Sequence, residues 1–301
     1  MLERPTNDGD EPTGQISTGL SRRALLSGLL TATGLSLLGV IPTSAEAQEQ
    51  RVSKPRLIEM SDHKMPEGFT RSKILAEING QSEVIGSVFF LEESRAKAEF
   101  ITRKSSPEDF EAIQSTIRAR GDTVALVAAG AFFTSAGQTK GLALQDGQMV
   151  GEAQATDSLN GMLVIKNGVP SIEYLNQISD FQAFLAQAKK EGWDLFQQTS
   201  YIRPGGTFQS SNPNAYELRF FVEGEGKKAV VNFTEKMTYT EAVQALEQLA
   251  GFQIEKAIGL DTGTVSEGRF FDREGNACTM LDEQFGKGKG YTNLLVLFSD
   301  L

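Results

Sequence analysis

Short turn signals that divide apolar stretches are the feature that most constrains the fold of this chain. Asparagine and aspartate followed by glycine adopt the left-handed conformations that two-residue β-hairpins require. Such dipeptides occur at Asn79-Gly80, Asp146-Gly147 and Asn167-Gly168. With a further hairpin inferred from two apolar stretches, the predicted hairpins span residues 74–91, 142–150, 162–172 and 217–233. A chain with this many hairpins favours antiparallel sheets.

Three helices are also predicted, each from a start signal followed by apolar residues at helical spacing. Ser106 and Pro107 open the first and Ser179 opens the second. The third begins with a capping box from Thr238 to Glu241. The apolar faces are Phe110, Ile113 and Ile117; Phe181, Phe184 and Leu185; and Val243, Leu246 and Leu249.

The remaining apolar stretches are expected to be strands, at 98–102, 123–127, 256–260 and 293–298. The last is apolar on consecutive residues, as in a strand that is covered on both faces. Strands and helices together predict an α+β fold with a mixed, mostly antiparallel sheet and three or so packing helices. We expect a single domain from residue 73 to 301.

Residues 1–47 are interpreted as a twin-arginine signal peptide. Arg22-Arg23 precedes an apolar run over 24–41, and Ala45-Glu46-Ala47 supplies the small residues of a cleavage site. An N-terminal membrane anchor is the alternative, although the run is short and interrupted for the ~20 residues of a span. We expect a periplasmic or secreted protein, exported by the twin-arginine machinery, with no stable membrane span after cleavage. Residues 48–72 would form a polar leader.

Composition excludes several kinds of chemistry. The formal net charge of -10 argues against nucleic acid as a partner. Cys278 and His63 are the single cysteine and the single histidine, and His63 lies in the polar leader. A disulfide within the chain is excluded, and a serine protease triad, a histidine zinc site or a redox cofactor is disfavoured. No cofactor is identified, but oxygen ligands could hold a divalent cation such as calcium.

Glycine-containing loops follow three apolar strands, at Gly130, Gly205-Gly206 and Gly263. Glycine lets backbone N–H groups approach an anionic ligand closely, although a tight connection explains each loop as well. Asp261 ends an apolar strand, where it either serves a site or caps its own backbone. Arg219 interrupts an aromatic strand; it faces either solvent or a site, where it would be a fixed cation for a phosphate or carboxylate.

A series of short motifs runs along the chain. They are a glycine and phenylalanine loop, a Gly-Leu hairpin, a Gln-x-x stretch, an arginine on a strand, a Thr-x-x-Glu helix, a Leu-Asp loop with a downstream serine, and a closing Asn-x-x-Val strand. In chain order they are Ala129–Phe133, Gly141–Gly147, Gln198–Ile202, Arg219, Thr238–Glu241, Leu260–Ser266 and Asn293–Val296. The order and spacing of these motifs resemble the phosphodiester glycosidase domain family over about residues 84–298.

The resemblance implies roles for particular residues. Arg219 would neutralise phosphate charge, Asp261 would act as acid, base or metal ligand, and Glu267 would be a second carboxylate. The loops and motifs together give the candidate ligand-binding residues Gly130, Phe132, Gln198, Arg203, Thr262, Gly263, Ser266 and Asn293. The chain departs from the family where Ala129 replaces an asparagine, Ala131 and Thr262 replace glycines, Tyr201 replaces a proline and Lys289 replaces an arginine.

These observations lead to two hypotheses of different class. The first is an exported hydrolase acting on a sugar phosphodiester or a related envelope glycan. The second is a non-catalytic glycan-binding or envelope-assembly protein that keeps the same fold, which the departures at Ala129 and Thr262 motivate. Both make a carbohydrate or sugar phosphate the expected ligand.

Export should depend on the arginine pair. Replacing Arg22 and Arg23 together by lysine should leave the precursor in the cytoplasm, because the change keeps the charge but removes the arginine pair that the pathway reads. Cell fractionation with mass spectrometry of the exported N-terminus measures this, and Gln48 is the expected first residue. Normal export of the double variant would contradict the interpretation.

Overall fold

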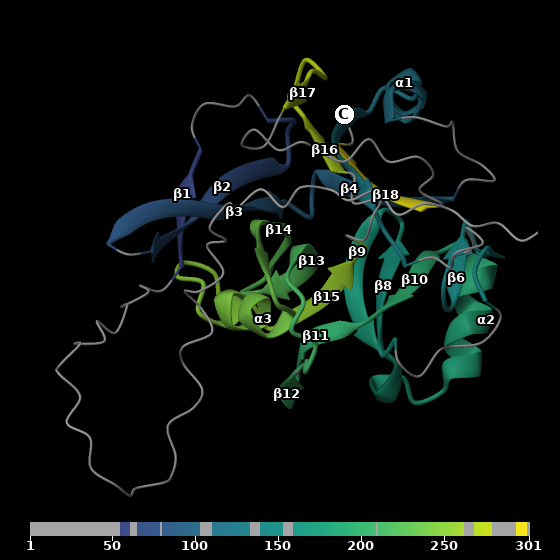
Figure 1. The fold of residues 1–301 in the computed structure, drawn as a ribbon. Coiled ribbons are helices and arrows are strands. Elements are labelled where there is room, and N and C mark those ends of the chain that lie inside the picture. Colours follow the sequence, from purple (N-terminus) through teal and green to yellow (C-terminus); the bar gives the residue numbers. More distant parts are fainter. Residues whose placement is uncertain are drawn as a thin grey trace, which may run out of the picture. The chain divides into compact units, whose positions relative to one another are not determined.

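The computed structural model describes residues 55–60, 65–78, 80–102, 110–132, 139–152, 159–208, 210–261, 268–278 and 293–299. All of them fall within one compact unit, Arg51–Leu301 (Figure 1). The helices are α1 (Phe110–Ala119), α2 (Phe181–Glu191) and α3 (Tyr239–Glu247), with a short 3-10 turn at Leu175–Gln177. The strands are β1 (Arg56–Glu59), β2 (Phe69–Ile78), β3 (Gln81–Leu91), β4 (Ala96–Thr102), β5 (Thr123–Ala129), β6 (Ala143–Gln145), β7 (Gln148–Met149), β8 (Gly161–Lys166), β9 (Val169–Tyr174), β10 (Asp194–Gln198), β11 (Ser200–Arg203), β12 (Gly206–Thr207), β13 (Tyr216–Gly224), β14 (Lys227–Met237), β15 (Lys256–Leu260), β16 (Gly268–Phe271), β17 (Ala277–Cys278) and β18 (Asn293–Ser299).

The described strands form three sheets. Sheet 1 has the order β1-β2-β3-β14-β13-β15-β11-β12, sheet 2 the order β7-β6-β10-β8-β9, and sheet 3 the order β17-β16-β5-β18-β4. Each predicted hairpin is present, as β2–β3, β6–β7, β8–β9 and β13–β14. At the β8–β9 turn, Asn167 and Gly168 have φ of 53° and 80°, the paired positive values of a tight hairpin.

The prediction of an α+β fold with a mixed sheet is wrong. The protein is mostly β, with antiparallel pairing between every pair of neighbouring strands in the three described sheets. The physical reason is that the hairpin turns fix antiparallel pairing wherever they occur. The helices of the described chain have nine to eleven residues each and cover separate patches, so they do not make a helical layer.

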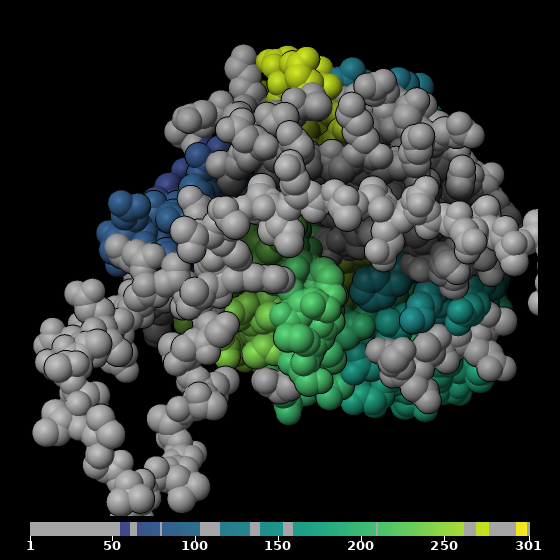
Figure 2. Space-filling view, viewed as in Figure 1, coloured from purple at the N-terminus to yellow at the C-terminus, as the bar shows by residue number. Residues whose placement is uncertain are grey.

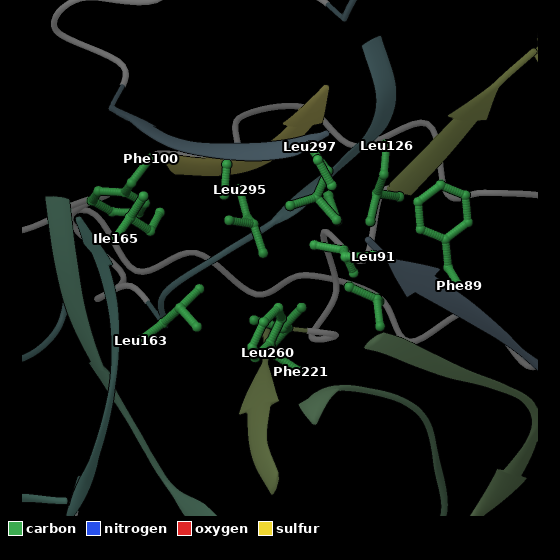
Figure 3. Packing of buried hydrophobic residues seen from close by; sticks show 14 of the residues in the cluster. Phe89, Leu91, Phe100, Leu126, Leu163, Ile165, Phe221, Leu260, Leu295 and Leu297 are labelled. Atoms are coloured by element: carbon green, nitrogen blue, oxygen red, sulfur yellow. The ribbon is translucent and has the colours of Figure 1, made fainter. Parts of the chain in front are cut away.

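One apolar cluster, the central core, is shared by all three sheets. Phe89, Phe221 and Leu260 come from sheet 1, Leu163 and Ile165 from sheet 2, and Leu295 and Leu297 from sheet 3. Figure 3 shows these side chains converging from strands that are far apart in the sequence. Burying each such side chain contributes about 1.5–3 kcal/mol, so this cluster is the main link between the sheets.

The outer face of each sheet packs against one helix. On sheet 3, Ile117 of α1 joins a cluster with Val124 and Val296. On sheet 2, Leu185 of α2 joins a cluster with Val164. On sheet 1, Leu246 of α3 belongs to a cluster with strand residues of that sheet. Each sheet therefore has one face on the central core and one face under a helix.

Sequence signals located α2 and α3 well. The capping box of α3 is present, with Thr238 accepting from the backbone N–H of Glu241. Asp180, and not Ser179, caps α2 by accepting from Ala183, and Gly192 ends it with φ of 69°. Ser106 and Pro107 lie outside the described residues.

The strand β18 is buried on both faces, as its apolar sequence predicted. Leu295 and Leu297 point into the central core, whereas Leu294 and Val296 point toward α1. At the other end of the chain, the segment expected to be a polar leader, 48–72, contributes β1 and the start of β2. Isolated apolar residues in that segment, such as the buried Met65 and Phe69, have no periodicity that a sequence pattern could detect.

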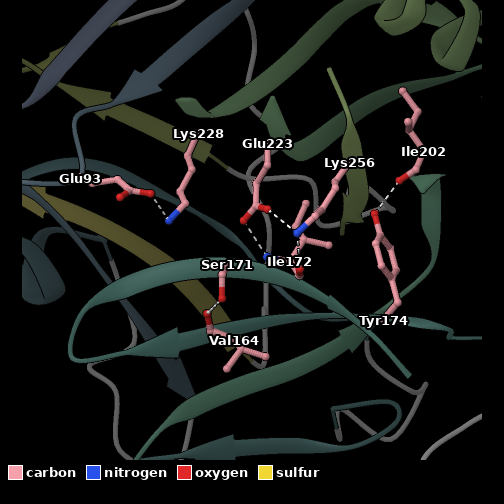
Figure 4. A network of polar contacts seen from close by, with 9 residues as sticks. All are labelled: Glu93, Val164, Ser171, Ile172, Tyr174, Ile202, Glu223, Lys228 and Lys256. Carbon is pink, nitrogen blue, oxygen red and sulfur yellow. Dashed lines mark hydrogen bonds and ion pairs between the residues drawn. The ribbon is translucent and has the colours of Figure 1, made fainter. Parts of the chain in front are cut away.

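Polar contacts hold sheet 2 against sheet 1 at one edge of the central core (Figure 4). Glu223 accepts a hydrogen bond from the Ile172 N–H and pairs with Lys256 at 2.9 Å. The Tyr174 hydroxyl donates to the Ile202 carbonyl.

No helix in the described part of the chain is long and apolar enough to cross a membrane.

Asp194 joins sheets 2 and 3 through a buried carboxylate. Its Oδ2 accepts from the N–H of Phe100 at 2.9 Å, and its Oδ1 accepts from the N–H of Asp146 at 2.7 Å. Burial raises the pKa of Asp194 from 3.8 to about 6, although the two N–H bonds oppose that rise.

The contribution of Asp194 to stability should therefore fall as the pH rises from 4 to 6. A folded-state pKa above the unfolded value means that the folded protein binds the proton more tightly, so the stabilisation is complete below pH 4 and is lost above pH 6. The upper limit of the Asp194 contribution is roughly 3 kcal/mol. The free energy of unfolding, measured by denaturant titration at several pH values in this range, should change less with pH in Asp194→Asn than in the wild type. An equal dependence on pH in the two proteins would contradict this assignment.

Candidate functional site

One end of the central core is polar, and each sheet supplies a buried side chain to it. Arg219 comes from β13 of sheet 1, Gln198 from the end of β10 in sheet 2, and Asn293 from the start of β18 in sheet 3. Their exposed fractions are 3%, 0% and 2%. By strand alternation, each shares a face with a residue of the central core: Phe221, Phe196 and Leu295, respectively. We call this region the polar end.

The carbonyl of Gly130 connects the strands at the polar end. It follows β5 and accepts two hydrogen bonds, from the Asp261 N–H at 3.0 Å and from Gln198 Nε2 at 2.9 Å. The position favours glycine, because a Cβ would lie 3.2 Å from Asn293 Oδ1 and 3.3 Å from the Leu295 nitrogen, both tight contacts. The ends of β5, β10 and β15 therefore meet at one backbone atom.

The neighbouring glutamines Gln197 and Gln198 differ in how their amides are used. Gln197 is bonded at both ends: Oε1 accepts from the Leu142 N–H and Nε2 donates to the Leu159 carbonyl. Gln198 donates through Nε2 to Gly130, but its buried Oε1 has no hydrogen-bond partner among the described residues. A buried oxygen without a partner costs free energy, so this atom is a candidate contact for a ligand that donates a hydrogen bond.

Asn293 fixes the loop after Gly130. Its Oδ1 accepts from the N–H of Ala131 at 2.7 Å, and its Nδ2 donates to Thr139 Oγ1 at 3.2 Å. Phe132, the next candidate along the loop, is half-buried, and its carbonyl accepts from the N–H of Lys140. Asn293 and Phe132 thus help to hold the chain segments on either side of the loop in position.

Arg219 and Asp261 lie at the same strand ends. Arg219 is paired with Leu260 across β13 and β15, and Asp261 follows Leu260 directly. Because successive strand side chains point to opposite faces, Arg219 and Leu260 face the central core while Asp261 faces the side of α3. Tyr239 lies at the start of α3. Its pKa is raised by burial and then by the neighbouring Tyr216, and the charge of Asp261 adds to that rise. The two residues would approach a ligand from different sides of the end of β15.

Of the other predicted site residues, one lies away from the polar end and the rest lie outside the described residues. Arg203 is exposed in the β11–β12 hairpin, at the end of β11 that is farther from Gln198. Thr262, Gly263, Ser266 and Glu267 lie outside the described residues. Within the described ranges, no group of three or more histidine, cysteine, aspartate or glutamate residues could hold a metal ion.

Sequence reasoning missed other buried polar residues on the core side of sheet 1. Asn232 and Ser87 continue the row of Arg219 across β14 and β3. Arg71 on β2 is 2% exposed, faces the core beside Phe89, and has its guanidinium 5.7 Å from the centre of the Phe270 ring. A polar residue between apolar neighbours, as at Asn232 between Val231 and Phe233, was the available signal. Arg71 lies between Thr70 and Ser72, in the segment interpreted as a leader, and shows no such signal.

No family model matches the chain, and no curated protein matches its sequence. Among solved structures, the chain is similar to the catalytic domain of zebrafish N-acetylglucosamine-1-phosphodiester alpha-N-acetylglucosaminidase, auto-inhibited by its pro-peptide. That match has a TM-score of 0.49 and 13% identity, and covers 81% of this chain and 87% of that one. A hypothetical protein from Synechocystis is similar with a TM-score of 0.46 and 13% identity, over 82% of this chain and 68% of that one. Both similarities concern the course of the backbone alone.

The two glutamines should respond differently to substitution. Gln197→Leu leaves the buried Leu142 N–H without its acceptor, so the free energy of unfolding should fall by about 1–3 kcal/mol. Gln198→Leu removes an unsatisfied oxygen, and Gly130 keeps its bond from Asp261, so its effect should be within about 1 kcal/mol. Chemical denaturation of both variants tests this. A larger loss for Gln198→Leu than for Gln197→Leu would make Gln198 the structural residue of the two.

Proposed function

We propose that the chain is an exported hydrolase that acts on a sugar phosphodiester or a related envelope glycan. The observation that carries the proposal is the buried Gln198 Oε1, an acceptor with no hydrogen-bond partner in the part of the chain that the structure describes. It belongs to the side chain that binds the Gly130 carbonyl, to which the backbone of Asp261 is also bonded. An unused acceptor, a carboxylate and the nearby Arg219 are thus held by neighbouring strand ends.

These groups suit the two parts of a sugar phosphodiester. A sugar hydroxyl can donate to Gln198 Oε1, whereas an ionised phosphodiester has no proton to donate there. The phosphate charge is instead stabilised by the guanidinium of Arg219, whose planar donors match phosphate oxygens. Because Arg219 is already buried in the folded protein, little side-chain ordering is needed when the ligand binds.

Hydrolysis adds water across the cleaved bond, so the water loses a proton and the departing oxygen gains one. Asp261 is the carboxylate proposed to transfer that proton as general acid or base, or to bind a divalent cation that activates the water. Its place at the end of β15 fixes the main chain that carries the carboxylate, since its own N–H is bonded to the Gly130 carbonyl. We further propose that the protein works outside the cytoplasm, after twin-arginine export.

A second candidate function is non-catalytic glycan binding in envelope assembly. The observation that favours it is that the amides of Gln197 and Asn293 are engaged with the protein itself. In addition, Ala129 is 3% exposed and has no polar side-chain atom, whereas the family that this chain resembles has an asparagine at this position. A protein of this kind would bind the same ligand without turnover.

Turnover should depend on Asp261 and binding on Arg219. The exported chain is incubated with methyl esters of sugar 1-phosphates, with and without calcium, and cleavage is followed by phosphorus NMR. Asp261→Asn should abolish cleavage while ligand binding stays intact or tightens, because a negative charge near the phosphate is removed. Arg219→Gln should weaken binding by about 1.5–3 kcal/mol, with a smaller loss in Arg219→Lys.

Asp180→Asn is the matched control, because Asp180 is an exposed carboxylate that caps α2. It should leave binding and cleavage unchanged. Binding without cleavage by the wild type would favour the second function. Loss of thermal stability in both site variants, with ligand affinity unchanged, would show that Arg219 and Asp261 are structural.

A further inference from the structure

Three tyrosines form an aromatic surface beside Asp261 on the α3 side of sheet 1. Tyr201 and Tyr239 are stacked, with ring centroids 5.5 Å apart and planes at 19°, and Tyr216 lies 5.7 Å from Tyr239. Tyr201 is buried, Tyr239 is half-buried and Tyr216 is 36% exposed. The rings therefore lead from the interior to the surface, and we call the three residues the tyrosine platform. In Figure 2, the segment that follows β11, drawn in green, faces the viewer.

The backbone places this platform at the end of β15. A Cβ on Gly259 would lie 2.8 Å from Tyr201 Cε2, so glycine is needed for the Tyr201 ring to lie directly on the strand. Asp261 comes two residues later, and its charge helps to raise the pKa of Tyr239 after the larger effects of burial and of Tyr216. Strand geometry and electrostatics therefore agree that the platform and the Asp261 carboxylate are neighbours.

The chain around the platform is held in place by its own hydrogen bonds. Thr240 Oγ1 donates to the Ser210 carbonyl at 3.2 Å, and Asn212 donates through Nδ2 to the Tyr216 hydroxyl at 3.4 Å. Phe208 packs edge-on against Tyr201 at 5.1 Å. A surface ordered before binding loses little conformational entropy when a ligand arrives.

We propose that the tyrosine platform binds the ring of a sugar, with Tyr216 as its outer contact. Tyrosine has an apolar face, which suits the C–H face of a sugar ring, and a hydroxyl edge, which suits its hydroxyl groups. The three side chains of the platform are uncharged, so they fit the neutral ring and not the phosphate. The hydroxyl and amide at its rim favour a polar ring over a lipid chain or an apolar protein segment. This inference rests on the proposed function for the identity of the ligand class.

The experiment measures binding separately from turnover. Binding of methyl glucoside, glucose 1-phosphate and N-acetylglucosamine 1-phosphate to the exported chain is measured by saturation-transfer NMR titration. Inorganic phosphate, the reference without a ring, has no C–H protons and is followed by the broadening of its phosphorus NMR line. The variants are Tyr216→Ala and Tyr216→Phe. Tyr216 is exposed, so neither should change the thermal midpoint appreciably. Tyr216→Ala should raise the Kd of the sugars roughly tenfold, while Tyr216→Phe, which keeps the ring, stays within about threefold.

Inorganic phosphate should be unaffected by either variant but should bind more weakly to Arg219→Gln. Sugar binding that depends on Tyr216, in a protein with no turnover, would keep the platform and reject the hydrolase. Turnover with the same KM and Kd in Tyr216→Ala would reject the platform and keep the hydrolase. Failure of every sugar to bind would overturn the platform. A Tyr216-dependent site that binds anilinonaphthalene sulfonate, an anionic dye with apolar rings, and no sugar would also overturn the platform and would assign the surface to an apolar partner.

Discussion

Burial of both faces of the inner strands of each sheet is the constraint on which the rest of this structure depends. The hairpin turns commit the chain to antiparallel strands, and several of those strands are apolar on consecutive residues. Such strands cannot leave one face in water, so the three sheets share the central core on one side and each packs under one helix on the other. The alternation along β18, with Leu295 toward the core and Val296 toward α1, shows the arrangement within a single strand.

The candidate site follows from where this shared core ends. Because the three sheets all face the central core, their strand ends come together. The buried backbone groups at those ends have little access to water and must find hydrogen-bond partners within the protein. Gln197, Asn293 and the Asp261 N–H meet this requirement by binding carbonyls, N–H groups or a hydroxyl of adjoining segments. Gln198 meets it through one atom and leaves the other unused within the described chain. Because its equally buried neighbour Gln197 is bonded at both ends, the unused oxygen of Gln198 does not follow from burial alone.

Local signals predicted the hairpins, the positions of α2 and α3, the capping box of α3 and the doubly covered strand β18, because each depends on residues close in sequence. The class of fold was not predicted, since three helices and many strands are compatible with both an α+β layer and separate covered sheets. Gly130, Gln198 and Asn293 were selected from motifs, and the structure brings them together. Arg203 had an equally suggestive loop but lies in a hairpin at the other end of its strand. Arg71 and Gln197 were missed because their burial comes from packing between distant segments, which no local pattern encodes.

The end of β15 divides the charged and the neutral parts of the candidate site. Leu260 and Arg219 face the central core, and Gly259 leaves room for Tyr201 on the opposite side, toward which Asp261 also points. A small anion could contact the arginine alone, and a neutral sugar could contact the tyrosines alone. Only a ligand that has both an anionic group and a ring, and that lies across the strand end, would contact Arg219, Asp261 and the tyrosine platform together. The selectivity of the site would then arise from the length of the link between ring and phosphate, because the two sets of groups are held on opposite sides of the end of β15 by the packed elements around it.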